Sequence, residues 1–233
     1  MPSRSASKPS SRKPSSRRAA ARSTRGTTGA VEVYKFGGAS LADADAVRHA
    51  IGLIADAPSP RVVTVVSALA GVTDALLDIA DTALRGDVAR VDKAVDALRL
   101  RHHAVANGVM TRQAERKALC AELDDVFAEL QALAHGVASL RELTPRTRDY
   151  LVVRGEQLSA RLVVAGLVAR GVKARYVEAA EVIVTDGVFG NAFPDLAATD
   201  KQVRARVQPL LARRIIPVVP GFVPVLREAA ATA

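Results

Sequence analysis

The chain has 233 residues, 49% of them apolar and 24% charged, a composition typical of a globular protein with one medium-sized core. The formal charge of +9 comes almost entirely from residues 1–30, which carry eight basic side chains and no acidic one. The other residues are nearly balanced, with 25 basic and 24 acidic side chains, so the composition gives no reason to expect a basic folded face for nucleic acid.

Residues 1–30 are rich in Ser, Arg, Lys, Pro and Ala, and we predict a disordered tail. The tail has no aromatic residue on which a base could stack, and any binding of nucleic acid through it would fall steeply with salt. Its Arg- and Ser-rich, acid-free composition is also that of organelle transit peptides, although it lacks a clear amphipathic period. The longest apolar stretch, residues 62–72, is too short to span a bilayer. We therefore expect a cytoplasmic protein without a membrane segment, and organelle targeting by the tail is the alternative.

After the tail, short apolar runs alternate with helical patterns. Strands are predicted over residues 31–36, 61–67, 173–177, 182–185 and 215–219. Helices are predicted around residues 47–54, 76–84, 144–171 and 200–211. The run over 61–67 is too uniformly apolar to have one face in water, which predicts a central strand. This alternation predicts an α/β fold, a three-layer sandwich whose mainly parallel sheet binds ligands at the carboxyl ends of its strands.

Residues 88–140 are helical almost throughout, and we interpret them as an inserted helical hairpin. The expected organisation is a tail (1–30), an α/β domain (31–222) with this insert, and an irregular end (223–233). No metal site is expected, because none of the four histidines has acidic or cysteine partners at ligand spacing. Those histidines are His49, His102, His103 and His135.

The segment Lys35-Phe36-Gly37-Gly38-Ala39-Ser40 joins the first strand to the first helix. Glycine lets backbone N–H groups approach phosphate oxygens, and a lysine can neutralise the charge of a transferring phosphoryl group. The segment is neither a Walker A motif nor G-x-G-x-x-G. Taken alone, it is equally well explained as an ordinary glycine-containing turn between a strand and a helix.

Four segments, in the same order, resemble the aspartate kinases of the amino acid kinase family. They are the glycine turn at 35–40, V-V-S-A-L-A-G-V-T-D at 65–74, G-E-Q-L-S at 155–159 and the stretch 185–195. The resemblance spans about residues 31–222 and extends to forms fused to a second enzyme. It implies an amino acid kinase fold, ATP with Mg²⁺ as cofactor, and L-aspartate as the substrate whose β-carboxylate attacks the γ-phosphate. That reaction is the first step towards lysine, threonine and methionine.

The resemblance also implies roles for individual residues. Lys35 would be catalytic, and Gly37, Gly38 and Ser40 would bind phosphate. Ser67, Thr73 and Glu156 would bind the substrate, with the Glu156 carboxylate holding the α-ammonium of aspartate. Without the resemblance, Glu156 is a solvated helix charge and Ser67 a turn hydroxyl. Asp186, Phe189, Gly190 and Asn191 belong to a loop that either lines the site or is purely a structural turn.

Two positions differ from the family pattern. Ala39 replaces a hydroxyl residue in the first segment, and Val153-Arg154 replaces the Ser-Phe that usually precedes Gly-Glu. An arginine at position 154 could pair with Glu156 or extend into solvent, and either would alter the charge of the pocket.

The family pattern continues beyond Phe222 into a glycine-rich segment and a nucleotide-binding portion that this sequence does not show. We therefore expect a domain truncated at its C-terminus, with impaired or no activity, and with a tendency to aggregate or to depend on a partner. The alternative function is a non-catalytic aspartate-binding or regulatory fragment that associates with a full-length kinase. Association with a second copy of the chain is a further expectation.

Overall fold

The structure, a computed structural model, describes residues 30–189 and 192–223. Its strands are β1 (Glu32–Phe36), β2 (Val62–Val66), β3 (Ala174–Tyr176) and β4 (Ile216–Pro220). Its helices are the 3-10 helix η1 (Gly38–Leu41), α1 (Ala44–Ala55), α2 (Val72–Leu84), α3 (Val88–Val109), α4 (Gln113–Leu140), α5 (Pro145–Ala169), α6 (Ala179–Val182), α7 (Leu196–Arg206) and α8 (Gln208–Ala212). None of the helices in these two ranges has the length and apolar composition needed to cross a bilayer.

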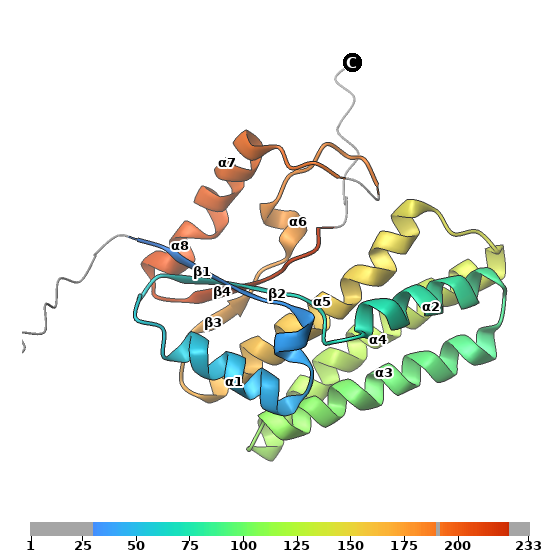
Figure 1. Cartoon of the computed structure of the whole chain (residues 1–233), viewed down its shortest axis with the longest axis horizontal. Coiled ribbons are helices and arrows are strands. Elements are labelled where there is room, and N and C mark those ends of the chain that lie inside the picture. Colours follow the sequence, from blue (N-terminus) through green and yellow to red (C-terminus); the bar gives the residue numbers. More distant parts are fainter. Residues whose placement is uncertain (1–29, 190–191, 224–233) are drawn as a thin grey trace, which may run out of the picture.

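The four strands form one parallel sheet in the order β1-β2-β4-β3, and helices cover both of its faces (Figure 1). The larger layer contains α1 and the long helices α2–α5, and its core includes Val66 and Val218. The smaller layer contains α6, α7 and α8, and its core includes Val177 and Val219. The predicted α/β fold with a parallel central sheet between helical layers is therefore confirmed.

In the second half of the chain one predicted strand is wrong and one predicted helix has different bounds. The segment predicted as a strand over 182–185 instead follows the short helix α6, which begins where the Glu178 carboxylate accepts the N–H of Ala179 at 3.1 Å. The helix predicted over 200–211 starts earlier, because the Asp195 side chain caps α7. It is also divided into α7 and α8 next to Pro209, whose nitrogen has no hydrogen to donate.

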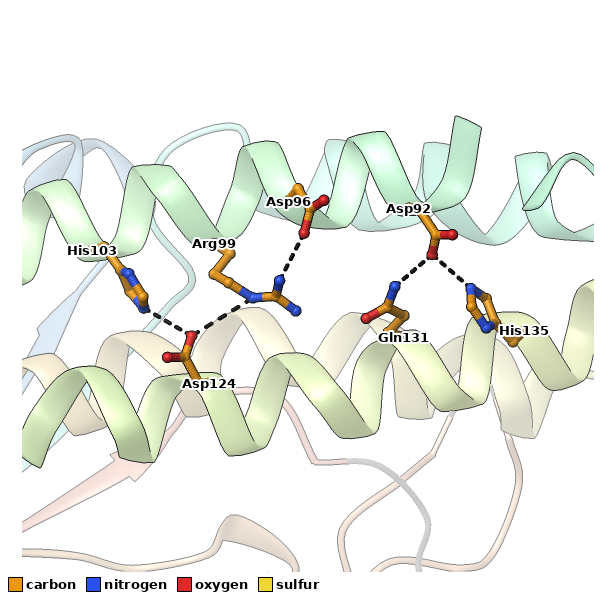
Figure 2. Close-up of polar contacts among 7 residues, drawn as sticks. All are labelled: Asp92, Asp96, Arg99, His103, Asp124, Gln131 and His135. Carbon is orange, nitrogen blue, oxygen red and sulfur yellow. Dashed lines mark hydrogen bonds and ion pairs between the residues drawn. The ribbon is translucent and has the colours of Figure 1, made fainter. Parts of the chain in front are cut away.

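Helices α3 and α4 run antiparallel and meet along a row of polar contacts (Figure 2). The Asp92 carboxylate accepts hydrogen bonds from Gln131 and from His135, whose Nε2 lies 2.7 Å from it. About three helical turns further along the pair, His103 Nε2 lies 2.9 Å from Asp124 Oδ1. These acidic partners were not predictable from spacing along one helix, because each comes from the neighbouring helix.

Candidate functional site

Three strands end side by side at the carboxyl edge of the sheet. In the sheet register Phe36 is paired with Val66, and Val66 with Pro220. The N–H of Ser67 donates to the carbonyl of Phe36 at 2.9 Å, and the N–H of Gly221 donates to the carbonyl of Val66 at 3.0 Å. The glycine turn after β1, Ser67 after β2 and the segment after β4 are thereby held next to one another.

The glycine turn lies at the start of η1, where the N–H of Ser40 donates to the carbonyl of Gly37 at 2.9 Å. Gly38 packs against the backbone that follows β2, whereas the space beside the Gly37 Cα is open. Ser40 is exposed and does not cap α1, because the Asp43 side chain accepts the N–H of Ala46 at 2.9 Å. Lys35 and the two glycines lie directly at the end of β1, and Ser40 follows in η1.

Glu156 extends from α5 to the same edge, where its Oε2 accepts the backbone N–H of Phe222. Burial raises the pKa of this carboxyl group, while hydrogen bonds from Phe222 and Gly221 and the positive charge of Lys35 lower it. A half-buried carboxylate gains from a nearby cation, since burial costs an unpaired charge more than a paired one. The arrangement suits the binding of an ammonium group next to the Lys35 side chain.

Two residues that the sequence analysis left without a role bring Glu156 to this edge. A Cβ at Gly155 would lie 3.0 Å from side-chain atoms of Ala68, Val72 and Leu76, so only glycine lets α5 approach α2 so closely. The buried hydroxyl of Ser159 donates to the carbonyl of Ser67 at 2.6 Å. Both residues belong to the G-E-Q-L-S segment, so the resemblance marked the segment as important. Their contacts could not be predicted, because they form only when α5 packs against α2 and the end of β2.

Arg154 follows neither of the two alternatives that the sequence left open. Its Nη1 lies 2.8 Å from Glu129 Oε2 of α4 and donates to Gln157 Oε1 at 2.9 Å. Its side chain is 18% exposed, so it does not extend into solvent. The charge of Glu156 is therefore left for another cation.

The remaining predicted site residues belong to α2 and to the loop after α6. Thr73 is exposed in the first turn of α2. The Asp186 carboxylate accepts the N–H groups of Val188 and Phe193 at 3.1 and 3.2 Å, which shapes its own turn. The Phe189 ring lies 5.5 Å from the guanidinium carbon of Arg146, at the start of α5. Gly190 and Asn191 lie outside the described residues.

Residues 31–230 match the model of the amino acid kinase family. The chloroplastic aspartokinase 3 of Arabidopsis thaliana is 36% identical over 196 residues, which cover 82% of this chain and 33% of that protein. The lysine-sensitive aspartokinase 3 of Escherichia coli is 31% identical over 193 residues, which cover 83% of this chain and 40% of that protein. The chain thus spans about a third of the length of the curated relatives it matches.

A solved structure is also similar to this chain. The structure of E. coli aspartokinase III in complex with aspartate and ADP has a TM-score of 0.72 and 29% sequence identity, and the match covers 83% of this chain and 41% of that one. The similarity therefore includes the fold as well as the sequence. Because the family model matches most of its length, this chain belongs to the amino acid kinase family, and within that family it resembles the aspartokinases.

Proposed function

We propose that this chain contributes the aspartate-facing part of an aspartate kinase site. The enzyme would transfer the γ-phosphoryl group of ATP to the β-carboxylate of L-aspartate. The observation that supports the proposal is the meeting of Lys35, the open side of Gly37 and the Glu156 carboxylate at one edge of the sheet. A cation and free backbone donors suit phosphate, and a half-buried carboxylate suits the α-ammonium of an amino acid.

The reaction needs positioning and charge neutralisation rather than a covalent enzyme intermediate. A β-carboxylate oxygen of aspartate forms a bond to the γ-phosphorus, while the bond from that phosphorus to the bridging oxygen breaks and ADP leaves with the electron pair. Lys35 would neutralise charge on the transferring group, and the turn at Gly37 and Gly38 would bring backbone N–H groups close to it. Glu156 would orient aspartate through its ammonium group.

ATP is proposed to arrive as its Mg²⁺ complex, as in other phosphoryl transfers. Residues 30–189 and 192–223 contain no group of three or more His, Cys, Asp or Glu side chains placed to hold a metal ion. We therefore assign no protein ligand to the ion in this part of the chain.

The proposed product, 4-phospho-L-aspartate, is the first intermediate on the route to lysine, threonine and methionine. We propose a cytoplasmic location for the chain. The name of the Arabidopsis relative places that protein in the chloroplast, so residues 1–30 are the candidate segment for targeting to an organelle. A second copy of the chain or a full-length kinase is the proposed partner.

The proposal is tested by aspartate-dependent release of ADP from Mg²⁺-ATP, comparing the purified full chain with Lys35→Ala. We expect the rate to fall by about 100-fold or more, because removal of one charge-stabilising group costs on the order of 100–1,000-fold. Lys93→Ala changes another exposed lysine, on α3, and should leave the rate unchanged. Equal rates in the wild type and Lys35→Ala would contradict the assigned role, and aspartate binding without ADP release would support the non-catalytic alternative.

A further inference from the structure

Polar side chains from three elements form one hydrogen-bonded cluster beside Glu156. The cluster consists of Glu129 on α4, Arg154 and Gln157 on α5, and Glu178 between β3 and α6. Arg154 Nη1 bonds to Glu129 and to Gln157, and Gln157 Nε2 donates to Glu178 Oε2 at 2.9 Å. This polar cluster joins the long helices to the last part of the sheet.

The middle of the polar cluster is buried, and Arg154 Nη1 and the Gln157 amide are paired, whereas Arg154 Nε is buried without a hydrogen-bond partner. The Gln157 residue is 7% exposed and bonds at both ends of its amide. Glu178 also accepts hydrogen bonds from the Tyr176 hydroxyl and from the N–H of Ala179. These hydrogen bonds favour one arrangement of the cluster over others, because a shift would leave the buried Gln157 amide without its partners.

The polar cluster attaches α5 to its neighbours close to Glu156. Arg154 and Gln157 stand two residues before and one residue after Glu156, and they attach α5 to α4 and to Glu178. Ser159 attaches the same turn to the carbonyl of Ser67. A side chain on a helix ends roughly 6 Å from the axis, so a rotation of about 10° would move the Glu156 carboxylate by about 1 Å.

We propose that Arg154 is a positioning residue for Glu156. Through Glu129 and Gln157 it fixes the rotation of α5, and thereby the place of the carboxylate at the sheet edge. The helical hairpin α3–α4 then has a part in ligand binding, because α4 supplies Glu129. The consequence for aspartate rests on the proposed function, whereas the claim about the position of the carboxylate does not.

The test uses the ¹⁵N-labelled full chain and follows the amide resonance of Phe222, which donates to Glu156. Arg154→Met keeps the apolar stem but removes both hydrogen bonds. We expect it to shift the Phe222 resonance and to weaken L-aspartate binding by about tenfold or more, since a misplacement of about 1 Å can cost on the order of 100-fold. Arg154→Lys keeps a donor, so it should shift the Phe222 resonance less and weaken L-aspartate binding less than Arg154→Met does.

Arg148→Met is the matched control. It removes another ion pair of α5, that of Arg148 with Asp81 at 2.7 Å, and leaves the polar cluster intact. It should change neither the Phe222 resonance nor the affinity for aspartate. Glu129→Gln serves as a milder second variant, because Glu129 is 61% exposed and glutamine keeps an acceptor oxygen; we expect a smaller shift of Phe222 in the same direction.

The positioning role of Arg154 and the proposed function can be contradicted by different results. An unchanged Phe222 resonance in folded Arg154→Met and in Glu129→Gln would overturn the positioning role. A wild-type chain that binds no L-aspartate, but whose Phe222 resonance responds to Arg154→Met and not to Arg148→Met, would overturn the proposed function and leave the positioning role supported.

Discussion

Gly37 and Gly38 are neighbours in the chain but have different surroundings. A Cβ at Gly38 would lie 3.2 Å from the carbonyl oxygen of Ala68 and 3.5 Å from the Cα of Ala70. A Cβ at Gly37 would meet no atom within 4 Å, and the backbone there, with φ of −79° and ψ of 171°, is open to any residue. Gly38 is therefore required for packing between the first two strand ends, while the space beside Gly37 is open, and in the proposed function a phosphate occupies that space.

This difference predicts separate effects of two alanine substitutions. Gly38→Ala should lower the free energy of unfolding by about 1–3 kcal/mol, because backbone atoms must move to admit the methyl group. Gly37→Ala should leave stability within about 0.5 kcal/mol but reduce aspartate-dependent ADP release, because the methyl group enters the phosphate space. Urea unfolding and the rate of ADP release measure the two effects. A Gly37→Ala protein with undiminished activity would remove this turn from the phosphate site.

At the scale of elements, the contact between α3 and α4 buries an ionisable group. His102 is fully buried, its Nδ1 lies 2.7 Å from the carbonyl of Leu98, and the edge of its ring faces Phe127. Burial lowers the pKa of His102 to about 4; the bond to Leu98 opposes this, and the charges of Arg101 and His103 add to it. The imidazole is therefore neutral in the folded chain at neutral pH.

The lowered pKa predicts a loss of stability in acid. In the unfolded chain the imidazole binds a proton below about pH 6.5, whereas in the folded chain it does so only near pH 4. The stability from this group is thus present above the unfolded pKa and is lost as the pH falls towards 4. The loss should be on the order of 2–3 kcal/mol.

His102→Leu should lack this loss, since leucine does not titrate. Urea unfolding at about pH 7 and about pH 4.5 gives the difference for the wild type and for the variant. His49→Leu replaces an exposed histidine on α1 and should keep the wild-type difference. Equal acid losses in wild type and His102→Leu would show that this side chain does not titrate as its burial requires.

At the scale of the whole molecule, the sheet and its order could be predicted in part. All four strands overlap predicted segments, because β-branched and aromatic residues mark β1, β2 and β4 and because β2 is too apolar to have one face in water. The strand predicted over 182–185 failed because a side-chain cap at Glu178 starts a helix first. A helix cap depends on where a single side chain lies, and the pattern of apolar residues does not predict that position.

The candidate site was predictable as a set of residues but not as an arrangement. The resemblance indicated Lys35 and Glu156, but the contact of Glu156 with Phe222 joins residues that are far apart in the chain. It requires both the register of β2 with β4 and the rotation of α5. The pairing of Arg154 with Glu129 requires the packing of α4 against α5, so the sequence alone left its partner open.

In the proposed site, Glu156 holds the ammonium group of aspartate at the sheet edge. The most direct test is calorimetric binding of L-aspartate and of succinate, which has the same two carboxylates and no ammonium, to the wild type and to Glu156→Gln. Glutamine keeps an oxygen to accept the N–H of Phe222, so the fold should be preserved. Glu122→Gln, which changes an exposed glutamate on α4, is the control.

We expect the wild type and Glu122→Gln to bind L-aspartate roughly tenfold or more tightly than succinate, since a charge-assisted hydrogen bond contributes about 1.5–3 kcal/mol. In Glu156→Gln the two ligands should bind alike. If Glu156→Gln preferred L-aspartate as strongly as the wild type does, another group would bind the ammonium, and the proposed role of Glu156 would be contradicted.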